Sequence, residues 1–320
     1  MTDRTPDSPP MAGAAGALSG AGFGAGLGMG AGPSVRLGSY AYLQRLMLQR
    51  TGIVLESGKE YLVEARLHAV AQREGCASVA ALLEALETEE IPGPLHRKVV
   101  EAMLNGETSF FRDHYPFEAL RTVLLPELMA RRASTRTLQF WSAATSSGQE
   151  AYSLAMMLLE AAPVLQDWDV RILATDVSEA MLERARSGVY RQIEVNRGLP
   201  AACLVRHFER CGQDWKVKDR VRAMVEFSHM NLAASWPSLP LFDVILLRNV
   251  LLYFSSEARR TILLGVTRQL RPDGYLFLGG GETILSLDRS FETARAGKAV
   301  CYKVRADRGT SPRGTGEGTG

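Results

Sequence analysis

The segment from Leu138 to Glu160, LQFWSAATSSGQEAYSLAMMLLE, decides the fold class of this 320-residue chain. Residues 138–142 are mainly apolar and predict a β-strand, whereas residues 150–160 predict an α-helix. A loop of small residues connects the two. A strand that passes through a short loop into a helix is the repeating unit of a parallel sheet covered by helices.

The same alternation continues downstream. Further strands are predicted at residues 170–175, 242–247 and 275–279, and further helices at 179–187 and 256–270. Because these strands carry apolar residues on both faces, we expect an α/β fold with a doubly wound, Rossmann-like sheet. The alternation is lost in a charged stretch at about 190–224, which predicts an inserted subdomain within the main domain, 106–305.

A helical region precedes this domain. Residues 36–105 are rich in Leu, Ala, Glu, Gln and Arg and predict a small all-α domain. Its helices are expected at 42–49, 59–73, 79–86 and 95–104. The leader, 1–35, consists mostly of Gly, Ala, Ser and Pro, and the tail, 306–320, is similarly poor in large apolar residues. Both are expected to be disordered, because they cannot bury enough side-chain surface to offset their ordering entropy.

Composition excludes several classes of protein. The chain is 46% hydrophobic but has no unbroken apolar run long enough for a membrane span, so no direct membrane insertion is expected. A net charge of +2 gives no reason to expect nucleic-acid binding. The four cysteines form no CxxC pair and stand at no ligand spacing with histidines, so no metal site is predicted. These features are typical of a cytoplasmic protein with free thiols.

The ends of the predicted strands carry the candidate chemistry, because doubly wound sheets bind ligands at the carboxyl ends of their strands. The loop 142–150 allows close approach of a ligand to the backbone, but it lacks the GxGxxG glycines of a pyrophosphate cradle. A plain strand-to-helix loop explains it equally well. Asp176 ends the next strand. Its carboxylate could accept hydrogen bonds from both ribose hydroxyls of an adenosine, or only cap the following helix.

A third strand ends in Arg248 and Asn249, followed by Tyr253 and Phe254. Arg and Asn need polar partners when they are partly buried, which favours a ligand here over a plain strand end. Together the three strand ends predict an adenosine-containing cofactor without a cradled diphosphate. S-adenosylmethionine fits best, since carboxylate and aromatic groups such as Glu150 and Tyr253 suit its sulfonium.

Several segments, taken in order, resemble the CheR-type chemotaxis methyltransferases. They are Gly106–Asp113, Trp141–Tyr152, Ala174–Asp176, Ala185–Tyr190, Arg248–Phe254, Leu270–Gly274 and Gly279–Glu282. The resemblance extends from about Tyr40 to Val304. It implies a helical N-terminal domain and a methyltransferase domain with a small inserted β-subdomain. It also implies methyl transfer from S-adenosylmethionine to glutamate side chains of methyl-accepting chemotaxis receptors, with S-adenosylhomocysteine as the other product.

The resemblance assigns site residues as well. The positions that match cofactor contacts are Thr108, Arg112, Glu150, Asp176, Asn231, Leu232, Arg248 and Asn249. Arg112 and Tyr253 match catalytic positions beside the transferred methyl and the acceptor carboxylate. Because a glutamate carboxylate is already ionised at neutral pH, its methylation needs orientation and no general base. The absence of an evident catalytic triad is therefore expected.

Departures from the family pattern bear on the partner. Gly106 stands where many members carry an asparagine that touches the cofactor, and Asn105 is one residue out of register, so that contact is not transferred. The stretch 207–215 is shorter than the loop of members that grip a receptor's C-terminal peptide, so such a tether is doubtful.

The presumed receptor-docking helix is the second one of the N-terminal domain. Lys59, Arg66 and Arg73 recur there at seven-residue spacing and share one face. That face would suit an acidic helix of the receptor, and a solvated charged face explains it equally well.

Two other functions stay open. The chain could methylate a different protein, as the sparse basic face and the short insertion allow. It could also be an S-adenosylmethionine-binding regulatory module without catalysis. The presence of both Arg112 and Tyr253 argues against a module, because a non-catalytic binder has no use for groups aimed at the methyl.

Overall fold

The computed structural model describes residues 37–90, 92–284 and 287–305. The leader and the tail for which disorder is predicted, 1–35 and 306–320, lie outside the described residues.

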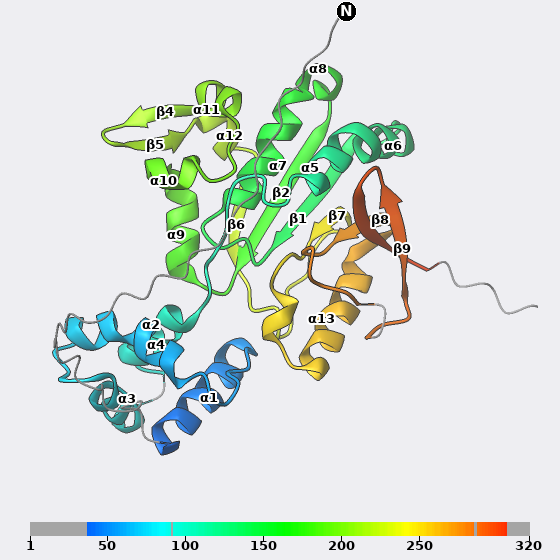
Figure 1. The fold of residues 1–320 in the computed structure, drawn as a ribbon. Helices are drawn as coiled ribbons and strands as arrows, with labels where there is room; N and C mark the ends of the chain where they lie inside the picture. The colour runs from blue at the N-terminus through cyan, green and yellow to red at the C-terminus, as the bar shows by residue number, and fades with distance from the viewer. Residues whose placement is uncertain (1–36, 91, 285–286, 306–320) are drawn as a thin grey trace, which may run out of the picture. The chain divides into compact units, whose positions relative to one another are not determined.

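The N-terminal part consists of helices, as predicted. They are α1 (Leu37–Thr51), α2 (Glu60–Arg73), α3 (Val79–Thr88) and α4 (Pro94–Met103) (Figure 1). Apolar residues recur every three or four positions, so each helix turns one stripe inward. These stripes form a core whose fully buried members include Leu43, Met47, Leu67, Leu82, Leu83 and Val99.

The second part is built on a seven-stranded sheet with strand order β6-β2-β1-β7-β8-β10-β9 (Figure 1). The strands are β1 (Thr137–Ala143), β2 (Asp169–Asp176), β6 (Val225–His229), β7 (Phe242–Leu246), β8 (Leu270–Phe277), β9 (Phe291–Ala296) and β10 (Ala299–Val304). The strands from β6 to β8 are parallel, and β10 is antiparallel to both of its neighbours. The predicted doubly wound, mostly parallel sheet is confirmed. Strand order reverses between β1 and β7, which places a ligand crevice at their carboxyl ends.

Apolar clusters cover both faces of the sheet. Phe140 packs in the cluster that contains the buried residues of α7 (Gln149–Glu160). Its neighbour Trp141 packs in the other cluster, which contains the buried residues of α13 (Ser256–Gln269). Successive residues of a strand point to opposite faces, so a sheet buried on both sides needs apolar residues at nearly every position. This requirement explains the apolar strands from which the fold was predicted.

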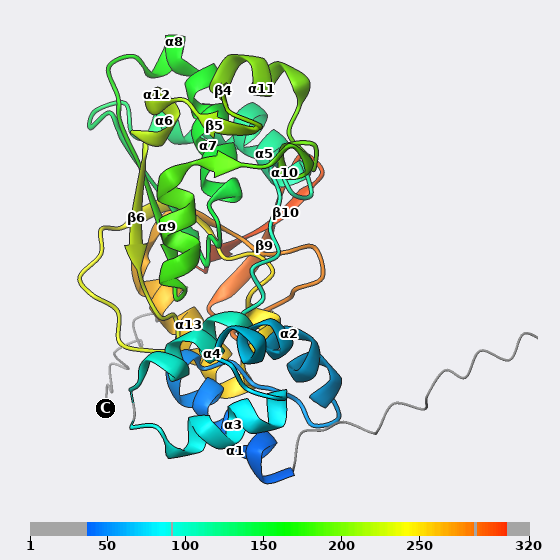
Figure 2. The same ribbon diagram turned by 90° about the vertical axis from the view of Figure 1, so that its left-hand side faces the viewer.

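The remaining helices connect or flank the strands. They are α5 (Tyr115–Ala119), the π-helical turn η1 (Leu120–Leu124), α6 (Leu125–Arg131), α8 (Ala162–Leu165), α9 (Glu179–Ser187) and the 3-10 turn η2 (Leu251–Tyr253). Figures 1 and 2 both show α9 beside β6, at one edge of the sheet.

The charged stretch after α9 forms the small inserted β-subdomain. Its three-stranded antiparallel sheet has the order β3-β5-β4 (Figure 2). The elements are β3 (Val189–Tyr190), α10 (Gln192–Val195), α11 (Ala201–His207), β4 (Phe208–Cys211), β5 (Asp214–Val217) and α12 (Asp219–Arg222). Only Gly212 and Gln213 connect β4 to β5.

The strands β6, β9 and β10 were not predicted, and β8 begins at Leu270 instead of residue 275. β6 and β9 are the two edges of the sheet, and both are largely half-buried or exposed. Their polar residues hide the apolar signal. The start of β8 contains Pro272 and Gly274, which are typical of turns. A register shift against β7 accommodates this irregular start.

The loop after α1 pairs with the loop after β7. Ile53 forms an isolated antiparallel bridge with Phe254, and the Val54 amide donates to the Tyr253 carbonyl at 3.0 Å. The Asn231 amide donates to the Arg50 carbonyl at 2.9 Å. None of the helices between residues 37 and 305 that the structure describes has the length and apolar character needed to cross a membrane.

Candidate active site

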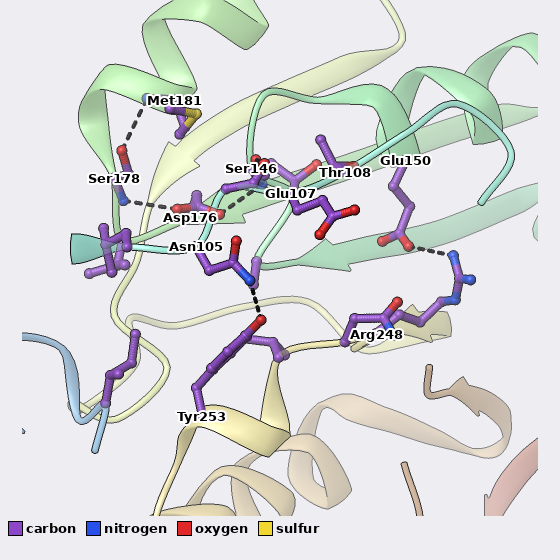
Figure 3. A pocket seen from close by; sticks show the side chains of 18 of the residues that line it. Asn105, Glu107, Thr108, Ser146, Glu150, Asp176, Ser178, Met181, Arg248 and Tyr253 are labelled. Atoms are coloured by element: carbon purple, nitrogen blue, oxygen red, sulfur yellow. Dashed lines mark hydrogen bonds and ion pairs between the residues drawn. The ribbon is translucent and has the colours of Figure 1, made fainter. Parts of the chain in front are cut away.

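A cleft opens at the carboxyl ends of β1 and β2 and beside the loop after β7 (Figure 3). Together with the open space at its mouth, the cleft spans about 850 Å³. Its lining residues come from five places: the α1–α2 loop, the segment 101–112, the β1–α7 loop, the end of β2 with α9, and the loop after β7. The crevice that the strand order predicts is therefore a real cavity.

Asp176 ends β2 at the floor of the cleft. One carboxylate oxygen accepts from the Ser146 amide at 2.7 Å, and the other accepts from the Ser178 amide at 2.9 Å (Figure 3). Burial raises the pKa of this carboxyl group, and these backbone hydrogen bonds oppose the rise. Ser178, whose hydroxyl accepts from the Met181 amide, is the N-cap of α9. Since Ser178 caps the helix, the remaining acceptor sites of Asp176 are available to hydroxyl groups of a ligand.

The β1–α7 loop follows the cavity wall closely. Ala144 and Ser146 have positive φ angles of 59° and 54°, and Gly148 has a φ of 90°. A Cβ atom on Gly148 would lie 2.9 Å from the Cβ of Ala185, so only glycine allows α7 and α9 to approach here. The small residues of this loop thus serve a tight backbone path beside the cavity, as its composition suggested.

Arg248 and Glu150 form an ion pair at the back of the cleft, 2.8 Å apart (Figure 3). The Arg248 side chain is only 1% exposed, and it also pairs with Asp113 at 2.7 Å and donates to the Arg112 carbonyl at 2.8 Å. The second oxygen of Glu150 accepts from the Ser142 hydroxyl at 2.8 Å. This buried cation therefore connects the loop after β7 to α7 and to the segment that carries Arg112.

Tyr253 and Arg112 line the same cleft. The Tyr253 hydroxyl accepts a hydrogen bond from the side-chain amide of Asn105 (Figure 3). The guanidinium of Arg112 is half-buried and donates to the Glu107 carbonyl at 3.1 Å. The two predicted catalytic side chains thus share one cavity with Asp176.

Most of the predicted site residues come together. Thr108, Arg112, Glu150, Asp176, Arg248, Asn249 and Tyr253 all line the cleft. Asn231 and Leu232, which follow β6, are not among its lining residues. Asn231 bonds to the α1 end instead, and Leu232 is buried in the apolar core on the α13 side. Their predicted contacts with the cofactor stay predictions.

Two residues of this region have roles that the sequence did not indicate. Asn105 is the partner of Tyr253, a role that its position one residue out of register with the family's asparagine did not indicate. Glu282, after β8, accepts from the backbone amides of Asn249 at 2.7 Å and Gly279 at 2.8 Å. A Cβ atom on Gly279 would lie 2.3 Å from the amide nitrogen of the Asn249 side chain, so glycine is required there. Glu282 and Gly279 therefore hold the loop after β7 in place.

The residues present fit S-adenosylmethionine. Asp176 keeps acceptor sites to which ribose hydroxyls could donate, and the aromatic ring of Tyr253 lines the same cleft and suits a cationic group. The β1–α7 loop has no glycine-rich diphosphate cradle. A doubly wound sheet with this site at its switch point defines an S-adenosylmethionine-dependent methyltransferase.

Family comparisons agree with this class. Residues 106–300 match the CheR methyltransferase, SAM binding domain, and residues 39–104 match the CheR methyltransferase, all-alpha domain. Chemotaxis protein methyltransferase 1 of Pseudomonas aeruginosa is 41% identical over 82% of this chain and 97% of its own length. The chemotaxis protein methyltransferase of Vibrio parahaemolyticus is 40% identical over 83% of this chain and 96% of its own length. The chain belongs to the CheR methyltransferase family.

Solved methyltransferase structures are similar over part of the chain. PKMT2 from Rickettsia typhi in complex with AdoHcy is 16% identical with a TM-score of 0.29, over 45% of this chain and 21% of that one. The glycopeptide N-methyltransferase MtfA complexed with S-adenosylmethionine is 17% identical with a TM-score of 0.28, over 47% of this chain and 48% of that one. Likeness at this level carries no argument about the site.

Proposed function

We propose that this cytoplasmic enzyme methylates glutamate side chains of methyl-accepting chemotaxis receptors, giving glutamate methyl esters and S-adenosylhomocysteine. The observation that carries the proposal is the chemistry of the cleft. Its lining, in the part of the chain that the structure describes, contains Arg112 and Tyr253 but no His, Cys or Lys. Its four carboxylates are engaged: Glu150 with Arg248, Asp176 with two backbone amides, Glu107 with Arg197, and Glu101 with the Ser178 hydroxyl.

Such a lining suits an acceptor that needs no general base. When bound, S-adenosylmethionine supplies an electrophilic methyl on its sulfonium, and an ionised carboxylate oxygen takes that methyl while the sulfur–carbon bond breaks, with no proton released. An amine or alcohol acceptor would have to lose a proton, and among the described residues that line this cleft we find no His, Cys or Lys, and no carboxylate without a partner, to accept it.

The chain's own residues therefore bind and orient. Asp176 accepts ribose hydroxyls and fixes the adenosine. Arg112 and Tyr253 donate hydrogen bonds to the acceptor carboxylate, remove water from it and hold it in line with the transferred methyl. Arg248 is too deeply buried and paired to meet the acceptor, and it positions Glu150 and the Arg112 backbone.

The docking proposal distinguishes Lys59, the residue just before α2, from Arg66 and Arg73 within that helix. Lys59 and Arg66 line a second pocket, which shares Ile53, Asn105 and Tyr253 with the cofactor cleft. Arg73 does not line this pocket, and its guanidinium donates to the Ala69 carbonyl of its own helix. We therefore propose that Lys59 and Arg66 meet the acidic receptor helix near the methylated glutamate, and that Arg73 contributes little.

Docking would disturb contacts that Lys59 and Arg66 already make within the chain. Lys59 lies 2.5 Å from Glu56, and Arg66 donates to the Met103 carbonyl at 2.5 Å. An acidic partner would have to replace or share these contacts. The two-residue connection between β4 and β5 supports receptor recognition without a C-terminal peptide tether.

A radiolabel experiment tests the proposal. The enzyme is incubated with methyl-labelled S-adenosylmethionine and membranes that contain receptors of the same organism, and the product is then treated with base. We expect volatile labelled methanol, because carboxyl methyl esters hydrolyse in base. Label that stays on protein after base treatment would show another acceptor chemistry and would refute the proposal. Heat-inactivated enzyme serves as the control.

A further inference from the structure

We propose that Asn105 is a positioning residue for methyl transfer. By donating its amide N–H to the Tyr253 oxygen, it leaves the phenolic hydrogen free to point at the acceptor carboxylate. This inference rests on the proposed function, because it requires a carboxylate acceptor.

The Asn105–Tyr253 pair occupies a particular place in the molecule. The two residues are 148 positions apart in the sequence, and their side chains meet across the cleft (Figure 3). Both line the cofactor cleft, and both also line the second pocket, which carries Lys59 and Arg66. The pair therefore forms part of the wall between the pocket that would hold the cofactor and the pocket that opens toward α2.

The direction of the hydrogen bond decides what Tyr253 can offer. A phenol has a single hydrogen, and an ionised carboxylate can only accept hydrogen bonds. If the Tyr253 oxygen accepts from Asn105, the hydrogen turns away from Asn105 and is available to one oxygen of the acceptor. Arg112, whose guanidinium can only donate, lines the same cleft. The Tyr253 hydroxyl and the Arg112 guanidinium therefore both offer hydrogen-bond donors, which is what an acceptor carboxylate requires.

The rest of Tyr253 is held without Asn105. The Tyr253 amide donates to the Val250 carbonyl at 3.1 Å, and its carbonyl accepts from the Val54 amide at 3.0 Å. The Asn105 side chain itself is exposed. Substitution of Asn105 should therefore change the orientation of the hydroxyl and leave the loop and the fold intact.

A double-mutant cycle tests the inference. The variants are Asn105→Ala, Tyr253→Phe and the pair of both, assayed for base-labile methyl transfer to a receptor fragment. We expect Asn105→Ala to lower kcat about 3- to 10-fold, the effect of a neutral hydrogen bond. The KM for S-adenosylmethionine and the Kd for S-adenosylhomocysteine should stay within about twofold of wild type. In the Tyr253→Phe background, Asn105→Ala should have no further effect on kcat, because it acts through the hydroxyl.

Asn105→Asp sharpens the test. A carboxylate at this position would accept the phenolic hydrogen and withdraw it from the acceptor, so the loss of kcat should exceed that of Asn105→Ala. Asn196→Ala is the matched control. Asn196 accepts from Gln192 in the inserted subdomain and does not line the cleft. It should leave kcat unchanged.

The outcomes separate the two proposals. Wild-type kcat in Asn105→Ala, or losses that multiply in the Tyr253→Phe background, would overturn the role of Asn105 while ester formation by the wild type still stands. A shifted thermal midpoint with parallel losses in cofactor affinity and kcat would assign Asn105 a structural role instead. A base-stable product from the wild-type enzyme would refute both the proposed function and this inference.

Discussion

The two ends of the central sheet each hold an arginine between two carboxylates, but the two clusters differ in their surroundings. At the amino end, Arg132 contacts Asp243 at 2.8 Å and Asp273 at 2.6 Å. At the carboxyl end, Arg248 contacts Glu150 and Asp113 at nearly the same distances. The residue types and the distances therefore do not distinguish a functional cluster from a structural one.

The surroundings make the difference. Asp243 is fully buried, and its second oxygen accepts from the Gln139 amide at 2.9 Å. Neither Asp243 nor its partners Arg132 and Asp273 line the cofactor cleft or the second pocket beside it. Arg248 is also buried and Glu150 is partly buried, but both line the wall of a cleft. An ion cluster with all of its partners inside the protein stabilises the fold, whereas one beside a cavity can arrange groups around a ligand.

The largest effect that we expect concerns the structural end. Asp243→Ala removes the fully buried partner of Arg132, whose own side chain is 13% exposed, and leaves the Gln139 amide without its acceptor. Breaking a buried pair in this way costs about 3–5 kcal/mol of stability. Denaturant unfolding, followed by the fluorescence of Trp141 in the adjacent strand β1, measures the loss.

Asp219→Ala is the matched control for this prediction. Asp219 is 87% exposed and pairs with Arg222 at 2.9 Å, so its removal should change stability little. If Asp243→Ala kept full stability and instead lost cofactor affinity, the contrast between the two ends would be wrong.

The next effect concerns the functional end. Asp176→Ala should weaken S-adenosylhomocysteine binding about 100-fold, because it removes charged acceptors for the ribose hydroxyls. Calorimetry measures the affinity, and a thermal melt checks the fold. Unchanged affinity in a folded variant would mean that the adenosine binds elsewhere in the cleft.

The carboxyl group of Asp176 should also make the affinity for S-adenosylhomocysteine depend on pH. Burial raises the pKa of Asp176, so it protonates at a higher pH than an ordinary aspartate. Because ribose hydroxyls need the ionised form as acceptor, binding lowers this pKa and releases a proton, and affinity should rise with pH. As the pH falls through the raised pKa, the Kd for S-adenosylhomocysteine should increase. Asp176→Asn, which cannot titrate, should have a weaker but flat profile over that range.

Tyr253→Phe should distinguish cofactor binding from methyl transfer in the cleft at the carboxyl end of the sheet. The phenyl ring keeps its packing and only the hydroxyl is lost, so S-adenosylhomocysteine affinity should stay within about twofold. We expect kcat to fall about 10- to 100-fold, the value of a hydrogen bond to a charged group. Steady-state kinetics with a receptor fragment gives both quantities. If binding and kcat fell equally, our division of roles, with Asp176 binding the cofactor and Tyr253 acting in methyl transfer, would be wrong.

The smallest effects concern docking. Lys59→Ala should raise the KM for the receptor about two- to fivefold at low salt, because exposed charges act mainly on encounter, and added salt should reduce the difference. Arg73→Ala, on the same helix face but away from the pocket, is the control and should have little effect. If Arg73→Ala raised the KM for the receptor more than Lys59→Ala, the docking surface would instead lie near the C-terminal end of α2.

The sequence predicted those strands whose residues are mainly apolar. β1, β2 and β7 are buried on both faces, so their apolar residues are evident without any tertiary information. β6 and β9 depend on pairing with a neighbour at the sheet edge, and their own residues do not indicate it. Asp176 could be selected in the same way, because a polar residue directly after an apolar strand can be recognised from the neighbouring sequence alone.

Contacts between distant segments could not be predicted from local patterns. Arg248 meets Glu150 and Asp113 across 98 and 135 residues, and Asn105 meets Tyr253 across 148. Such pairs depend on how the loops are placed and on side-chain rotamers. The sequence identified Arg248 as a cofactor contact and gave no sign that its charge is engaged by two carboxylates. Family resemblance supplied Arg112 and Tyr253, but it did not indicate that Asn105 contacts Tyr253.

The bridge between Ile53 and Phe254 has a consequence for how this family can change by recombination. The two family segments, 39–104 and 106–300, can be recognised separately, and Asn105 falls between them. Yet the loop that carries Tyr253 shares backbone hydrogen bonds with the segment after α1. An exchange of the helical domain between relatives would therefore also exchange one support of the loop that carries Tyr253. The two domains should be inherited as a pair, and hybrids should work only where the residues that meet Tyr253 are carried along with it.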